Sequence, residues 1–206
     1  EAVRHFSPGV ATAYITGGEL ILDIALLRSL DDFVDDEMSH QAMALINRDE
    51  SRHIAMDYHM TEYYCSEAYR EEVKSEPAKS LAERTKAAAA FAEMLYHARP
   101  FFMDVFFRPM ELVDPSNKRL FEAFKRMQML ALKPEVARTP FAKLMSGIRD
   151  AYKKPAVRKA LGPVLLRVIG LDEKVMVDLY SGDDKRRARE LSFDEMAQEA
   201  LGAKYQ

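Results

Sequence analysis

The sequence predicts an all-α protein, and three observations support this fold class. Glycine and proline are sparse, with eight and nine residues in a chain of 206. Helix-favouring residues such as alanine, leucine, methionine and glutamate dominate the composition. Apolar side chains also recur at the three- and four-residue intervals of an amphipathic helix. With 48% apolar residues at this length, the chain can bury a sizeable core.

The first two predicted elements form a helical hairpin. Residues 10–30 carry apolar or small side chains near helical spacing, and Ser7-Pro8 marks the start of this helix. The segment 31–36, which contains four aspartates, has poor helix propensity and is expected to reverse the chain. A long pattern without glycine or proline, 37–73, predicts the returning helix. The two helices should therefore pack antiparallel.

A linker and a further helix follow the hairpin. Residues 74–80 have the composition of a linker. Ser80 and Glu83 match a capping box, in which each side chain binds a backbone amide of the first helical turn. The helix that starts there is expected to end before Pro100, and Pro100 and Pro109 bracket an aromatic stretch.

Shorter helices are expected in the rest of the chain, separated by proline or glycine. Their patterns cover 116–132, 140–153, 155–169 and 171–180, and Ser192 with Glu195 indicates one last capped helix. We therefore expect three regions. They are a hairpin in 1–75, further bundle helices in 76–132, and short C-terminal helices, or a small subdomain, in 133–206.

Composition argues against several classes of protein. The net charge of −3 provides no overall basic field for nucleic acid, and the basic cluster at 185–189 is interpreted as a solvated surface. The single cysteine, Cys65, rules out an intrachain disulfide and favours a reducing, cytoplasmic location. No run of 18 apolar residues occurs, so no transmembrane segment is expected.

One constellation of residues points to chemistry. Glu50 and His53 lie three apart on the second predicted helix, so an oxygen and a nitrogen donor project from one face about one turn apart. Glu19 lies in an apolar run of the first helix, 31 residues upstream of Glu50. The midpoint between the two glutamates falls in the predicted turn. The hairpin should therefore bring both carboxylates to the same level, roughly 18–24 Å from the turn.

Two carboxylates at one level of a helical core repel each other unless a cation lies between them. This favours a metal site formed by Glu19, Glu50 and His53. The alternative is a structural polar network, in which Arg48 or Arg52 pairs with a glutamate and His53 is a core histidine.

The polar residues beside the candidate ligands are expected to support the site or to line it, and not to bind the metal. Asp49 could accept a hydrogen bond from a metal-bound histidine, and Asp23, one turn after Glu19, could support the ligands in the same way. Asn47 and Asp57 share the face of the candidate ligands and are interpreted as ordinary polar lining. A second Glu-x-x-His pair, Glu37 and His40, lies beside the predicted turn without a matching upstream carboxylate, so we assign it to the surface.

The segment Asp49-Glu50-Ser51-Arg52-His53 resembles the Asp-Glu-x-x-His signature of ferritin-like di-iron carboxylate proteins. A lone helical glutamate about 30 residues upstream is also typical of that family. The resemblance covers residues 10–73 only. It implies a ferritin-like antiparallel helical bundle, or half of one, with extra C-terminal helices. It also implies that Glu19 and Glu50 bridge two ions and that His53 is a terminal ligand.

That family needs two Glu and Glu-x-x-His sets, and this chain offers one. The other set is expected from a missing N-terminal half or a second chain. The cofactor implied is two iron ions, or manganese, or an iron–manganese pair. The expected function is an oxidoreductase, a non-haem di-iron oxygenase or oxidase acting on O2 and a small organic substrate. The alternatives are a ferritin-like protein for iron oxidation and storage, and a non-catalytic helical interaction module with a degenerate site. The substrate and reaction are not defined by the sequence.

Overall fold

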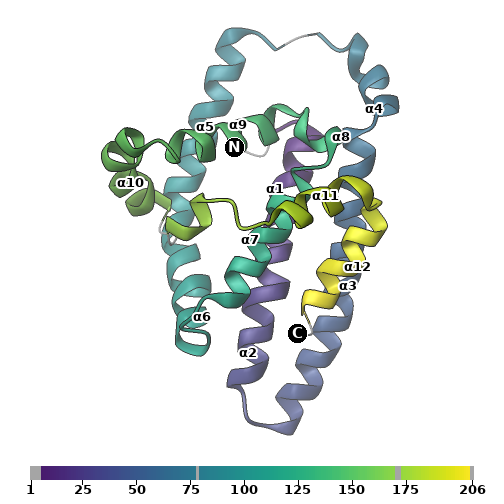
Figure 1. Ribbon diagram of the computed structural model, residues 1–206. Coiled ribbons are helices and arrows are strands. Elements are labelled where there is room, and N and C mark those ends of the chain that lie inside the picture. Colours follow the sequence, from purple (N-terminus) through teal and green to yellow (C-terminus); the bar gives the residue numbers. More distant parts are fainter. Residues whose placement is uncertain (1–5, 78, 170–172, 205–206) are drawn as a thin grey trace.

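Two long helices near the N-terminus form a hairpin in the computed structural model, which describes residues 6–77, 79–169 and 173–204. The first helix runs without a break through α1 (Pro8–Leu20), the π-helical segment η2 (Ile21–Leu27) and α2 (Arg28–Phe33). The second helix, α3 (Glu37–Cys65), returns antiparallel beside it (Figure 1). No β-strand occurs in the described ranges, so the all-α prediction is confirmed.

The ends of the hairpin helices follow the predicted signals. Ser7 caps α1 and accepts a hydrogen bond from the Val10 amide. The chain reverses at 34–36, inside the predicted turn, and Asp36 caps α3 by accepting a 2.9 Å hydrogen bond from the Ser39 amide. Residues 31–33 remain helical, so the turn is shorter than the Asp-rich segment.

The returning helix is shorter than the predicted 37–73. It ends at Cys65 because Ser66 is extended, with ψ of 157°, and its hydroxyl caps a new helix by accepting from the Tyr69 amide. That helix, α4 (Glu67–Glu72), is followed by the 3₁₀ turn η3 (Val73–Ser75). The absence of glycine and proline therefore did not guarantee a continuous helix, since serine can exchange a helical bond for a cap.

The next helix crosses both prolines that were expected to bracket the aromatic stretch. It comprises α5 (Leu81–Phe101), the π-helical segment η4 (Phe102–Phe107) and α6 (Arg108–Val113). The capping box of Ser80 and Glu83 is confirmed at its start. Pro100 lies inside α5, and the wider π-helical turns of η4 begin two residues later. A change of hydrogen-bond register beside a proline is a common way for a helix to tolerate the missing amide.

The rest of the chain consists of short helices. They are α7 (Lys118–Leu130), α8 (Pro134–Ala137), α9 (Pro140–Tyr152), α10 (Pro155–Ile169), the 3₁₀ turn η5 (Glu173–Met176), α11 (Gly182–Glu190) and α12 (Phe193–Lys204). The capped last helix is confirmed, because the Ser192 and Glu195 side chains each accept from the other's amide. The helix expected over 171–180 is reduced to η5, and residues 170–172 lie outside the described part of the chain.

The core joins one face of the hairpin to α7 and α12. Leu20 and Ile24 from the first helix, with Ile54 and Tyr58 from α3, belong to one buried cluster that also includes side chains of α7 and α12. Helices α1 and α7 approach closely at Gly17, where a Cβ atom would lie 2.8 Å from the methyl group of Met127. The candidate ligands lie on the two helices of the hairpin, Glu19 on α1 and Glu50 and His53 on α3.

One helix, Pro8–Phe33, is long and apolar enough to cross a membrane by length and composition alone. It packs against α3, α7 and α12, and its side chains contribute Leu20 and Ile24 to the core. Core helices of folded proteins pass the same test of length and composition, so this feature is weak evidence for a membrane protein.

Candidate metal centre

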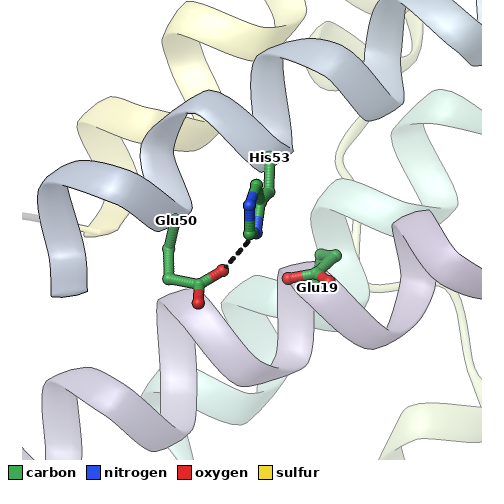
Figure 2. A group of neighbouring side chains, drawn as sticks. All are labelled: Glu19, Glu50 and His53. Atoms are coloured by element: carbon green, nitrogen blue, oxygen red, sulfur yellow. Dashed lines mark hydrogen bonds and ion pairs between the residues drawn. The ribbon is translucent and has the colours of Figure 1, made fainter.

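The three candidate ligands come from the two helices of the hairpin. Glu19 is the next-to-last residue of α1, two residues before the π-helical segment η2 begins. Glu50 and His53 lie near the middle of α3, one turn apart. Figure 2 shows all three side chains in the seam between the helices, with Glu50 and His53 extending from α3 toward Glu19 on α1.

The donor atoms of these side chains converge. One carboxylate oxygen each from Glu19 and Glu50 and one imidazole nitrogen of His53 all lie within 4.8 Å of one another. His53 Nδ1 lies 2.8 Å from Glu50 Oε2 (Figure 2). Donors that each lie ~2.1 Å from one ion are at most ~4.2 Å apart, so small side-chain movements suffice to place an ion between them. The donor set of oxygen and imidazole nitrogen fits Fe²⁺, Mn²⁺ or Zn²⁺.

The site is closed on one side and open on the other. The Oε2 atom of Glu19 is buried, and no described residue donates a hydrogen bond to it. The side chain of Glu50 is 19% exposed, whereas that of His53 is 51% exposed. The imidazole therefore reaches solvent, and the candidate ligands line a seam rather than an enclosed core.

Electrostatics in the seam favour a cation. Burial raises the pKa of Glu19, and the neighbouring charge of Glu50 raises it further. The hydrogen bond to Glu50 raises the pKa of His53. The carboxylates thus gain from any positive charge placed among them, whether a proton, the imidazolium of His53 or a metal ion.

Asp23 lies in the same region but is paired with a lysine. Its side chain is fully buried in η2, and Lys204 of α12, which is 1% exposed, forms an ion pair with it. Lys204 Nζ also donates a 2.7 Å hydrogen bond to the Asn47 carbonyl. Burial raises the pKa of Asp23 in spite of this partner. The nearest partner of Asp23 is therefore Lys204, and no hydrogen bond joins it to Glu19, Glu50 or His53 among the described contacts.

Asp49 is exposed and paired with an arginine. Its carboxylate pairs with Arg52 at 3.2 Å, and both side chains are more than half exposed. Arg52 consequently neutralises Asp49 and not Glu19 or Glu50. The arginine-based alternative weighed from the sequence is not seen in the described contacts, and the buried cation near the site is Lys204.

Asp57, which was interpreted from the sequence as ordinary polar lining, is influenced electrostatically by two of the candidate ligands. Burial raises its pKa to about 6, and the charge of Glu19 contributes while that of His53 opposes the shift. Its Oδ2 atom is buried, and no described residue donates a hydrogen bond to it. The sequence signal was its position four residues after His53 on the same helix face.

The second Glu-x-x-His pair lies outside this cluster. His40 Nδ1 contacts Asp31 Oδ1 at 3.0 Å near the hairpin turn, and its side chain is 46% exposed. Neither Glu37 nor His40 belongs to the group of converging donors. His40 is therefore a natural control for His53.

No protein-family model, no curated protein and no solved structure matches this chain.

Proposed function

We propose that Glu19, Glu50 and His53 bind a divalent transition-metal ion, iron or manganese. The observation that carries this proposal is the convergence of two carboxylates and one imidazole from two helices within 4.8 Å. No lysine or arginine pairs with Glu19 or Glu50 in the described contacts. Asp23 and Asp49, in contrast, each pair with such a residue. A divalent ion would supply the missing positive charge, because two carboxylates and one such ion sum to zero.

We further propose that the site is half of a di-metal carboxylate centre. Three donors leave positions of an iron or manganese ion to be filled by other groups. Side chains beside the ligands support a partner on this face. Ile15 and Ile46, each one turn from a candidate glutamate, are 49% and 42% exposed. A second Glu and Glu-x-x-His set, from a second chain or from another segment of the polypeptide, would cover them and complete the ligands.

The proposed chemistry is that of an oxidoreductase. Two such ions with open coordination positions supply O2 binding and reduction, with a small organic molecule as the substrate. The residues of this chain would hold the ions and keep them adjacent. The half-exposed imidazole of His53 supports access of small molecules to the site.

A structural role is the second candidate function, and the 2.8 Å contact between His53 and Glu50 favours it. In that case protonated His53 neutralises Glu50, and Glu19 takes up a proton, which its raised pKa facilitates. The hairpin would then be a helical interaction module without a metal.

Metal analysis of protein purified without oxygen separates the two functions. We expect iron or manganese near one ion per chain in the wild type and in His40→Ala, and less than about a tenth of that in His53→Ala. The two variants each remove the histidine of a Glu-x-x-His pair from α3, and only His53 belongs to the converging donors. Metal-free wild-type protein that also fails to take up added Fe²⁺ or Mn²⁺ would establish the structural role.

A further inference from the structure

We infer that Asp57 is a positioning residue of this centre, which accepts a hydrogen bond from the imidazole of metal-bound His53. The inference rests on the proposed metal site. It assigns to Asp57 the role that the sequence suggested for Asp49.

The orientation of His53 leaves one ring nitrogen for such a contact. Nδ1 lies 2.8 Å from Glu50 Oε2, so we assign the metal ion to Nδ1. A metal ion bound at Nδ1 leaves the proton on Nε2. Metal-bound histidines almost always donate this remaining N–H to a carboxylate, a carbonyl or water, which fixes the ring and makes it a better ligand.

Asp57 is placed to accept that proton. It lies four residues after His53 on α3, and side chains on a helix lean toward its N-terminus, so the carboxylate of Asp57 leans back toward His53. The two groups influence each other electrostatically, as do Asp57 and Glu19. One oxygen of Asp57 is buried without a hydrogen-bond donor among the described residues. A buried acceptor without a donor costs free energy, and the imidazole N–H would relieve that cost.

The other acidic residues near His53 have different partners. Asp49 is exposed and paired with Arg52, and Asp23 is paired with Lys204. Glu19 and Glu50 belong to the converging donors themselves. Asp57 therefore remains as the carboxylate for the outer side of the ring.

The test uses Zn²⁺, a redox-inert ion with the same ligand preferences, and compares Asp57→Asn with Asp49→Asn. Both changes remove one carboxylate from α3 within four residues of His53. Competition with a chromophoric chelator measures the affinity. We expect Asp57→Asn to weaken Zn²⁺ binding about 10–100-fold, the usual loss when such a supporting carboxylate is removed. Asp49→Asn should bind within about twofold of the wild type, since its carboxylate is paired with Arg52 on the exposed side.

A second measurement observes the hydrogen bond directly. In the Zn²⁺-loaded wild type, ¹H–¹⁵N NMR should show a slowly exchanging Nε2–H proton of His53, and Asp57→Ala, which leaves no acceptor at this position, should lose it. A role in packing alone would predict no such proton. Wild-type protein that fails to bind Zn²⁺ would overturn the metal site and this inference together. If the wild type binds Zn²⁺ but Asp57→Asn binds it equally well, or if His53 lacks the protected proton, only the role of Asp57 is wrong.

Discussion

Four acidic side chains lie around the seam of the hairpin, and they differ in the partners that offset the free-energy cost of burying a carboxylate. Asp23 forms an ion pair with Lys204 and Glu50 contacts His53, whereas Glu19 and Asp57 have no ion pair with a lysine or arginine among the described contacts, and each has a buried oxygen without a donor. This uneven distribution of partners is the residue-level basis for the candidate site. A carboxylate that is paired with a lysine has a structural role. A carboxylate without such a partner can instead bind a metal ion.

The ion pair of Asp23 and Lys204 should be important for stability. Replacing Lys204 with Met leaves a buried carboxylate without its cation, and breaking such a pair costs about 3–5 kcal/mol. The double variant Asp23→Leu with Lys204→Met should recover most of that loss. Urea unfolding of the metal-free protein measures both effects. As a control, Lys74→Met removes an exposed pair with Glu71 and should change the unfolding free energy by less than about 1 kcal/mol. Equal losses for the two lysines would contradict a special role of the buried pair.

Asp57 should make the stability of the metal-free protein depend on pH. Its pKa is about 6 in the folded protein, against an ordinary value of 3.8. Between these values Asp57 binds more protons in the folded state than in the unfolded state, so its contribution to the unfolding free energy should rise as the pH falls from 7 toward 4. Glu19 and His53, whose pKa values are also raised, change in the same direction. Asp57→Asn should reduce the slope, and an unchanged slope would show that Asp57 titrates normally.

At the scale of elements, the sequence predicted the helix caps, but it did not predict where α3 ends or where the helices change to π-helical hydrogen bonding. The caps of Ser7, Ser80 and Ser192 could be predicted because a cap depends on a few adjacent residues. The end of α3 at Cys65 could not, since Ser66 serves equally well inside a helix or as a cap. The two π-helical segments also leave no signal in a 3.6-residue pattern, because an i→i+5 bond is selected by packing.

The N-cap of α3 offers a test of an element that holds two candidate ligands. Asp36→Ala removes the acceptor for the Ser39 amide and should cost about 0.5–2 kcal/mol of unfolding free energy. Asp35→Ala removes the same charge one residue earlier, outside the cap, and should be near neutral. Thermal unfolding followed by circular dichroism distinguishes the two. Equal effects would indicate that net charge, and not the cap, determines the outcome.

At the scale of the whole molecule, the sequence predicted which residues would meet but not what surrounds them. The convergence of Glu19, Glu50 and His53 followed from helical spacing and a turn near the midpoint, both of which are local properties. The burial of Lys204 against Asp23 could not be predicted, because the two residues are 181 positions apart and meet only through the packing of α12 on the hairpin.

The open face leads to a prediction about assembly. One hairpin supplies two carboxylates and one imidazole, and a two-fold related copy would supply the same set, which gives four carboxylates for two divalent ions. The exposed Ile15 and Ile46 beside the ligands would become buried in that contact. We therefore expect anaerobic Fe²⁺ to raise the average mass of the chain in sedimentation equilibrium toward that of a dimer with one ion per chain. His53→Ala should remain at the mass of the metal-free protein, because it lacks the nitrogen ligand, whereas His40→Ala should associate like the wild type. A metal-loaded protein that stays at the mass of a monomer would contradict this assembly.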